Sequence, residues 1–571
     1  MRWETAQPDR QRTSQLESEL GLSPLLASLL VGRGIDSVDL AAGFLDPKLS
    51  EFANPLELPQ MRIAAERICE AIRKRQKVVV YGDYDVDGIT SVSLLLAFFR
   101  DVGFSASYML PSRFRDGYGL NPARVEEIAD EGYQLLITVD CGSASRNEVR
   151  FLAERGVDVI VTDHHRVQGE IPEALAFINP DGWEADNEWQ VLAGVGVAYL
   201  LVMAVHILLK SDDRYAERLQ PLKSYLDIVT LGTVADMVPL TGLNRALVVH
   251  GLAFLAGSQT RPGMIALREV SGLAGKPVDT TAIAFYMAPR INAAGRLGNA
   301  EIGVELLLSP SLRKALTLAK QLNEDNQRRR ELEGGIFEEA DRVVSSEMAR
   351  RNLRAIVLAS PDWHKGVLGI VASRLCEKYF RPTILMHIED GAATGSGRSI
   401  PGFDLAAALE GCSEMLLRHG GHAMAAGLTI DVEKLDGFRE HLEGLVAAAI
   451  PETHLEPALD IDVVVPLAEV DSRMIADLER LGPYGMGNSE PVIGVRNLLV
   501  KSRQIVGGDH LKLNVEQQGR VIEAIGFRMA DREVRRGDSI DLAFFPEIRA
   551  WGGMSYLQLR LKDVCQSQEE S

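Results

Sequence analysis

The stretch VVVYGDYDVDG, residues 78–88, decides the fold of the first half of the chain. It opens with an apolar, β-favouring run and then carries three aspartates, and a helical pattern over residues 61–76 precedes it. A run that is apolar on both faces is typical of a strand buried inside a parallel sheet, with helices on both sides. The stretch therefore predicts a strand of an α/β sheet that ends in acidic residues.

The same arrangement recurs twice along the chain, as QLLITVDCG (134–142) and as VDVIVTDHH (157–165). Each is a short apolar run that stops at a carboxylate or an imidazole. In open parallel sheets the functional groups gather beyond the carboxyl ends of the strands. We therefore expect one edge of the sheet to bring together Asp85, Asp87, Asp140, His164 and His165.

The acidic loop admits two other interpretations. Asp83, Asp85 and Asp87 match the opening of an EF-hand, but its twelfth position is Leu94 where a bidentate Glu is needed, and a strand precedes it where a helix is needed. A single strand-end Asp is more often a polar turn or a helix cap. Three carboxylates at alternate positions repel one another, however, which favours a site where cations neutralise them.

Carboxylate oxygens combined with imidazole nitrogen suit Mn²⁺ or Mg²⁺. A further Asp lies in the apolar segment LGTVADMVPL (231–240), where an unpaired charge is expensive. These groups are enough for two divalent cations, Mn²⁺ or Mg²⁺, with one carboxylate bridging them. The predicted metal ligands are Asp83, Asp85, Asp87, Asp140, His164 and Asp236. His165 lies next to this set and is predicted to hydrogen-bond a substrate oxygen, with support of His164 as the alternative.

These four motifs resemble those of the DHH phosphoesterase superfamily. The similarity continues in APRINAAGRLG (288–298), WHKGVLGIVASRL (363–375), GSGRSIPGFDL (395–405), GGHAMAAGL (420–428) and GPYGMGNSEP (482–491). The resemblance implies a parallel-sheet DHH domain, a DHH-associated α/β domain joined by a long helix, and a C-terminal all-β OB-fold. It implies a metal-dependent exonuclease that removes 5′-mononucleotides from single-stranded DNA in the 5′ to 3′ direction, in DNA repair and recombination.

By this resemblance the metal ligands carry over onto Asp85, Asp87, Asp140, His164 and Asp236. Many relatives have a His four residues before the first ligand Asp, and here that position is Tyr81. Asp83 is expected to substitute for it, because the two-residue period of a strand points it to the same side as Asp85.

The pattern of elements predicts the domain boundaries. The expected divisions are an N-terminal cap or arm (1–60), a metal-binding catalytic domain (61–265), a helical connector (266–345), a substrate-binding DHH-associated domain (346–450), an OB-fold (451–565) and a disordered tail (566–571). Short strands split by turns after residue 490 are the basis for the OB-fold.

Substrate contacts are predicted at cations beside small residues. Ser396 and Arg398, with Arg290 and Arg296, are expected to bind the terminal 5′ phosphate, because guanidinium groups bind phosphate bidentately. The alternative is that the glycine-rich segment around Ser396 is only a turn. Tyr118 is expected to stack on a base in a basic setting, with a packed loop aromatic as the alternative.

Composition limits the class of protein. The net charge is −19 over 571 residues, which excludes a histone-like cationic binder. Five cysteines lack CxxC spacing and favour a reducing compartment, and no long apolar run appears, so we expect a cytoplasmic protein with no membrane anchor. The protein is separately expected to be a monomer. The family resemblance adds single-strand binding protein and a helicase as expected partners.

Two rival functions remain. A DHH phosphodiesterase for short RNAs or cyclic dinucleotides would keep the same metal motifs, but such small substrates do not need an OB-fold. A non-catalytic replication scaffold would keep the fold and lose ligands, and here every expected acidic ligand is present.

Overall fold

The computed structural model describes residues 2–111, 119–167, 169–183, 189–451, 455, 457–551 and 554–567. The chain divides into two compact units. The larger unit spans 3–291, 300–319 and 459–571, and the smaller unit spans 292–299 and 320–458.

A five-stranded, all-parallel sheet forms the first half of the larger unit. Its strands lie in the order β3-β2-β4-β5-β6, with bounds β2 Val78–Tyr81, β3 Ser107–Met109, β4 Leu135–Val139, β5 Asp158–Thr162 and β6 Ala176–Ile178. Every residue of β2 and β4 is buried, so the predicted two-faced burial is confirmed. From β2 the chain adds β3 on one side and β4 on the other, and such a reversal opens a crevice beyond the strand ends.

Helices cover both faces of this sheet. One face buries Val79, Leu136 and Val159 in a core shared with α6 (Pro122–Asp130) and α7 (Arg146–Glu154). On the other face α5 (Val86–Asp101) and α8 (Gly194–Lys210) pack on the strands and on each other, and α4 (Met61–Lys74) packs on α8. Outside α5 lie α10 (Leu226–Ala235) and α11 (Gly242–Ala256).

The C-terminal part of the larger unit is a closed β-barrel. Its strands are β13 Val463–Val464, β14 Ile493–Val506, β15 His510–Gln517, β16 Arg520–Gly526, β17 Ser539–Trp551 and β18 Met554–Gln566. They follow the order β13-β14-β15-β16-β18-β17, and a pairing of β14 with β17 closes the sheet on itself. The predicted OB-type barrel is confirmed. The predicted tail starts at the last residue of β18, and residues 568–571 lie outside the described part.

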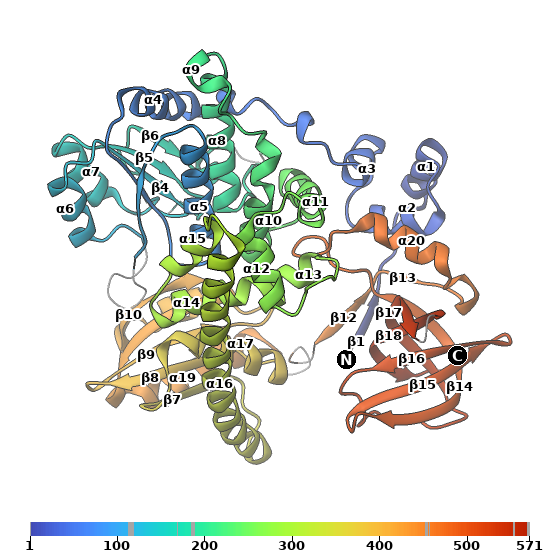
Figure 1. Cartoon of the computed structure of the whole chain (residues 1–571). Coiled ribbons are helices and arrows are strands. Elements are labelled where there is room, and N and C mark those ends of the chain that lie inside the picture. The colour runs from blue at the N-terminus through green and yellow to red at the C-terminus, as the bar shows by residue number, and fades with distance from the viewer. Residues whose placement is uncertain are drawn as a thin grey trace. The chain divides into compact units, whose positions relative to one another are not determined.

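The N-terminal segment shares its hydrophobic core with this barrel. The helices are α1 (Arg10–Leu20), α2 (Pro24–Gly32) and α3 (Val38–Leu45), and α20 (Ser472–Leu481) precedes the barrel strands. Leu16 and Leu26 are buried in one cluster with Leu481 and Ile493. At the edge of that cluster the Ser23 hydroxyl donates to Asp477 at 2.6 Å. Helices α1–α3 therefore pack on the barrel domain, where they lie beside α20 in Figure 1.

The smaller unit is a second α/β domain. Its mixed sheet has the order β10-β11-β9-β8-β7, with bounds β7 Ile356–Ser360, β8 Thr383–Glu389, β9 Ala392–Arg398, β10 Leu416–His422 and β11 Ala425–Asp431. One face packs on α18 (Leu405–Gly411) and α19 (Leu435–Ala449), and α17 (Leu368–Tyr379) packs on β8 and β9.

The segment between the two α/β domains is helical, as predicted. Its helices are α12 (Pro262–Val270), α13 (Thr280–Ala282), the π-helical turn η5 (Ile283–Met287), α14 (Ala288–Leu297), α15 (Glu301–Leu307) and α16 (Leu312–Arg350). The predicted long connecting helix is α16, with 39 residues. Among the described residues, none of the helices combines the length and the apolarity that a membrane crossing requires.

Candidate metal centre

The acidic loop after β2 bends into a helix at once. Strand β2 ends at Tyr81, and Asp85 is the N-cap of α5, where its carboxylate accepts a hydrogen bond from the Gly88 amide at 3.1 Å. The two-residue strand period therefore does not relate Asp83 to Asp85, so that part of the sequence argument is wrong. The turn nevertheless brings both carboxylates to within 4.8 Å of a carboxylate oxygen of Asp140.

Asp87 lies in the first turn of α5 and is almost completely buried. Its two carboxylate oxygens accept hydrogen bonds from the backbone amides of Gly194 at 2.7 Å and Val195 at 2.8 Å. These amides begin helix α8, whose N-terminus favours a negative charge. Two helices that are far apart in sequence, α5 and α8, therefore fix the orientation of this carboxylate.

Asp140 follows β4 in the left-handed conformation, with φ at 60°. A non-glycine residue held there indicates local strain, which proteins concentrate at functional sites. A β-carbon on Gly194 would lie 2.6 Å from an Asp140 carboxylate oxygen, so only glycine fits at that position. Asp140 is buried and close to the start of α8 as a result.

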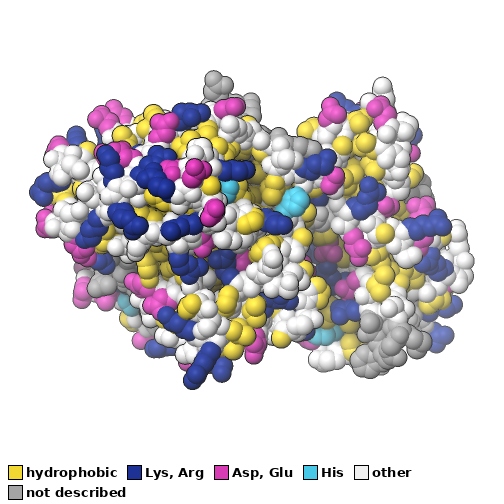
Figure 2. Space-filling model, turned by 45° about the horizontal axis from the view of Figure 1, so that its top comes forward, with side chains coloured by type: hydrophobic (Ala, Val, Ile, Leu, Met, Phe, Trp, Pro, Cys, Tyr) yellow, Lys and Arg dark blue, Asp and Glu magenta, His cyan; other side chains and the backbone are white. Residues whose placement is uncertain are grey.

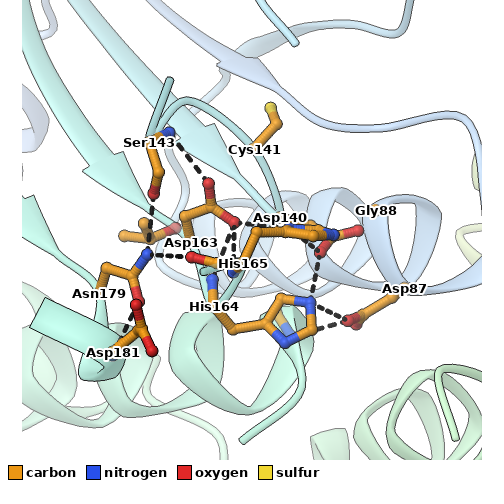
Figure 3. Close-up of polar contacts among 12 residues, drawn as sticks. Asp87, Gly88, Asp140, Cys141, Ser143, Asp163, His164, His165, Asn179 and Asp181 are labelled. Atoms are coloured by element: carbon orange, nitrogen blue, oxygen red, sulfur yellow. Dashed lines mark hydrogen bonds and ion pairs between the residues drawn. The ribbon is translucent and has the colours of Figure 1, made fainter. Parts of the chain in front are cut away.

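His164 follows β5 and points its Nε2 at three carboxylates (Figure 3). The distances from Nε2 are 3.1 Å to Asp140 Oδ1, 3.6 Å to Asp236 Oδ2 and 3.8 Å to Asp87 Oδ2. Burial is the main cause that lowers the pKa of His164 to about 4, so the ring is neutral at pH 7. Nε2 makes no hydrogen bond to any residue that the structure describes. A neutral ring with this buried nitrogen suits a metal ion.

His165 is held by a residue that the sequence argument did not single out. Asp163 accepts hydrogen bonds from the His165 Nδ1 at 2.8 Å and from the Ser143 amide at 2.9 Å. Burial alone would lower the pKa of His165, but the hydrogen bond to Asp163 and the charges of Asp163, Asp85 and Asp87 together outweigh it and raise that pKa. Asn179 donates to the His165 carbonyl and to the Ser143 hydroxyl, both at 2.8 Å (Figure 3). The only sequence signal for Asp163 was its place at a strand end.

Asp236 comes from outside the sheet. It is the C-cap residue of α10, and the chain after it continues through Met237 with φ at 60°. Its side chain is about one-fifth exposed, at 21%. The prediction that this Asp joins the strand-end residues is supported by its distance to His164, although it lies at a helix end.

Three sets of side chains in this crevice have the geometry to hold a metal ion. They are Asp83, Asp85 and Asp140; Asp140, His164 and His165; and Asp87, His164 and Asp236, each with ligand atoms within 4.8 Å of one another. Asp140 and His164 belong to two sets each. The structure therefore brings together all six predicted ligands, and their oxygen and nitrogen donors fit Mn²⁺ or Mg²⁺.

The electrostatics of the crevice require cations. Burial, then the nearby Asp85, raises the pKa of Asp87 to about 7. Burial, then Asp87 and Asp85, raises the pKa of Asp236 to about 9. The pKa of Asp140 is raised well above its usual value by burial and by four neighbouring carboxylates. Such a cluster is unfavourable at neutral pH until divalent charge compensates it.

Tyr81 takes no part in this crevice through its hydroxyl, which donates to the carbonyl of Gly119 at 3.0 Å. Tyr118, the predicted stacking residue, lies outside the described residues.

The predicted phosphate-binding residues fall in two places. In the smaller unit, the Arg398 guanidinium donates to the Ser396 hydroxyl at 2.9 Å, and a β-carbon on Gly369 would lie 2.8 Å from Arg398 Nη2. Arg296 donates to the Gly366 carbonyl at 3.0 Å, just before α17. These three predicted residues therefore surround the start of one helix, a position that favours anions.

Arg290 belongs to the larger unit and is buried. Its guanidinium donates to the carbonyl of Tyr286 and, at 3.2 Å, to the carbonyl of Val270. Its predicted contact with the 5′ phosphate stays a prediction.

The fold and the crevice together define a phosphoesterase of the DHH class. Residues 77–233 match the N-terminal domain of the DHH family, residues 352–448 match the DHHA1 domain, and residues 461–563 match the RecJ OB domain.

Similarity to individual proteins narrows the class to one family. The chain is 34% identical to the single-stranded-DNA-specific exonuclease RecJ of Bacillus subtilis, over 100% of this chain and 71% of that protein. It is 35% identical to the Escherichia coli exonuclease of the same name, over 97% of each chain. The crystal structure of Thermus thermophilus RecJ with Mn²⁺ superposes with a TM-score of 0.84 at 31% identity, over 100% of this chain and 80% of that one. The chain belongs to the RecJ family.

Proposed function

We propose that this chain is an exonuclease that hydrolyses single-stranded DNA from the 5′ end and releases 5′-mononucleotides by two-metal catalysis. The observation that carries the proposal is the position of Asp140, whose carboxylate is shared by two sets of ligand atoms. A shared carboxylate is typical of a pair of metal ions a few ångströms apart. RecJ relatives are named as single-stranded-DNA-specific exonucleases, and the one from Thermus thermophilus was crystallised with Mn²⁺ and with Mg²⁺.

In this proposal the six residues Asp83, Asp85, Asp87, Asp140, His164 and Asp236 hold the cations. Bound divalent cations stabilise charge on the phosphate and leaving oxygens and lower the pKa of water. The protein contributes the fixed directions of the ligands. The amides that begin α8 hold Asp87, and the close approach of Gly194 holds Asp140.

His165 is proposed to donate a hydrogen bond to a scissile phosphate oxygen. Asp163 accepts a hydrogen bond from the His165 Nδ1, so Nε2 lies on the other side of the ring, and the side chain is 45% exposed. The hydrogen bond to Asp163 is the largest of the effects that raise the pKa of His165, and a raised pKa favours the form that donates.

Recognition of the 5′ end is assigned to Arg296, Ser396 and Arg398, together with Arg290. The first three lie around the start of α17, where the helix dipole adds to the guanidinium charge. Tyr118 remains the proposed stacking residue of the segment before α6.

The barrel is proposed to bind the strand. Five cations, Lys501, Arg503, Arg532, Arg535 and Arg536, line a surface pocket of about 680 Å³ on it. Figure 2 shows that Lys and Arg side chains also lie among acidic ones over the face drawn there, despite the net charge of −19. Phosphates bind such local clusters regardless of total charge.

The remaining assignments are proposals of the same kind. The six-part domain division given above is kept, with the catalytic domain at 61–265. The five cysteines form no disulfide, and four of them are buried, which suits the cytoplasm. The chain is proposed to act as a monomer, with single-strand binding protein and a helicase as partners.

The proposal is tested by digestion of 5′-labelled and 3′-labelled single strands beside a blunt duplex, with Mn²⁺, Mg²⁺ or EDTA. We expect mononucleotides from the 5′ end of the single strand only, and no product in EDTA. Preferential hydrolysis of cyclic dinucleotides or short RNAs would contradict the proposal.

A matched pair of variants separates the metal centre from the fold. Asp140→Ala should abolish turnover and leave DNA binding largely intact. Asp39→Ala changes an aspartate in the first turn of α3, away from the crevice, and should keep full activity. Near-normal turnover in Asp140→Ala would show that the ligand assignment is wrong.

A further inference from the structure

Two adjacent aromatic side chains of the larger unit are left in solvent. Phe285 is 67% exposed and Tyr286 is 47% exposed, and both lie in the π-helical turn η5. Single exposed apolar residues are common and need no explanation. A π-helical turn is rare, however, and is frequently found at functional sites. Two exposed aromatic rings on a π-helical turn together indicate a ligand-binding surface.

Buried residues and hydrogen bonds hold the backbone of this turn in place. Ile283 and Met287, at its two ends, are completely buried. The carbonyl of Tyr286 accepts hydrogen bonds from the Arg290 guanidinium and, at 3.3 Å, from the Ser271 hydroxyl. The backbone that carries the two rings is therefore fixed before any ligand arrives, which lowers the entropy cost of binding.

The same turn is tied to the metal centre through the larger unit. Element η5 packs on α10, the ten-residue helix that ends at Asp236. The segment 482–488 adds a second link, because the Tyr484 carbonyl accepts from Thr280 at 2.5 Å and the Met486 carbonyl accepts from the Leu240 amide at 2.8 Å. The two rings thus lie on a scaffold shared with the crevice.

We propose that Phe285 and Tyr286 form a stacking platform for unpaired nucleobases of the strand being digested, with Phe285 as the main contact. This inference rests on the proposed function. Every base has an aromatic face, so stacking is independent of sequence, and a base within a duplex has its faces covered by its neighbours. A chain with net charge −19 also gains from affinity that does not depend on phosphate contacts. The platform therefore favours single strands.

The test compares Phe285→Leu and Tyr286→Leu with the unchanged protein. Leucine keeps an apolar side chain but removes the aromatic face. Binding of a fluorescent oligodeoxythymidylate is measured in EDTA, and KM and kcat are measured with Mn²⁺. We expect Kd and KM to rise about 5- to 150-fold for Phe285→Leu, corresponding to about 1–3 kcal/mol, with kcat nearly unchanged. Phe285→Trp keeps an aromatic face, so it should bind the oligonucleotide as the unchanged protein does.

An abasic strand makes the test specific. The unchanged protein should bind it at least as weakly as Phe285→Leu binds the intact strand, because every base contact is absent. On the abasic strand Phe285→Leu should cost little further affinity, because the contact that it removes is already missing. Leu40→Ala, which removes a 58% exposed apolar side chain from α3, is the control and should bind both strands normally.

Equal binding of intact and abasic strands by the unchanged protein would overturn the platform, as would normal Kd and KM in both leucine variants. If the unchanged protein binds strands through Phe285 but releases no mononucleotides, the proposed exonuclease activity fails and the platform stands.

Discussion

Replacing Asp140 by Asn should make the metal-free protein more stable while it destroys activity. In the metal-free crevice Asp140 is buried beside Asp83 and Asp85, with oxygens within 4.8 Å of one another. Two unit charges at that separation repel by about 3–4 kcal/mol at an effective dielectric constant of about 20. Partial protonation and His164 relieve some of this, so we expect a gain of about 2–4 kcal/mol in the free energy of unfolding.

Thermal unfolding at pH 8 in EDTA measures this gain, which for a unit of this size corresponds to a rise in Tm of roughly 2–5 °C. With Mn²⁺ at about 1,000 times Kd the order should reverse, because each bound ion then stabilises the unchanged protein by about 4.1 kcal/mol.

Asp227 provides the matched control. It is equally buried in the larger unit, but it is paired with Arg261 at 2.7 Å. Asp227→Asn should therefore lower Tm in both EDTA and Mn²⁺, because it leaves a buried cation without its charged partner. An Asp140→Asn protein that is less stable than the unchanged one in EDTA would refute the account of the crevice as a repulsive cluster that requires cations.

Three further predictions concern the same crevice. In EDTA, the free energy of unfolding should fall as pH rises from about 4 through about 7, because the pKa of Asp87 is raised to about 7 in the folded state and so exceeds its unfolded value. Urea unfolding across that pH range measures the change. A free energy of unfolding that does not vary with pH would contradict the prediction. Asp163→Asn should lower kcat about 10- to 100-fold with a smaller effect on Mn²⁺ affinity, because it releases His165; titration calorimetry and steady-state rates separate the two effects. Gly194→Ala should weaken Mn²⁺ binding, because its β-carbon would lie 2.6 Å from Asp140, and unchanged affinity would argue against that close approach.

The sequence was sufficient to predict the residues that meet in the crevice, because strand ends can be recognised locally. Asp140 and His164 follow apolar runs, and parallel strands bring such ends to one edge. Asp236 was found from its apolar surroundings, although the helix end that positions it could not be inferred.

Contacts between residues that are far apart in the chain could not be predicted from the sequence. Asn179 and Gly194 carry no sequence signal of their own, and only the fold places them against His165 and Asp140. Arg290 looked like a phosphate ligand by its neighbours, yet its guanidinium also binds two backbone carbonyls. The exposed ring of Phe285 could not be predicted either, because an aromatic residue in a helical pattern is usually buried.

The packing of α1–α3 on the barrel has a consequence for synthesis of the chain. The hydroxyl of Ser23 and the carboxylate of Asp477 are 454 residues apart in sequence. Leu16 and Leu26 are therefore synthesised long before the residues of α20 and the barrel against which they pack. Their apolar side chains stay without these contacts in the nascent chain while both α/β domains are translated. A truncated product that ends before the barrel would keep the apolar side chains of its N-terminal helices exposed. Chaperones and proteases are therefore expected to bind and degrade such a product.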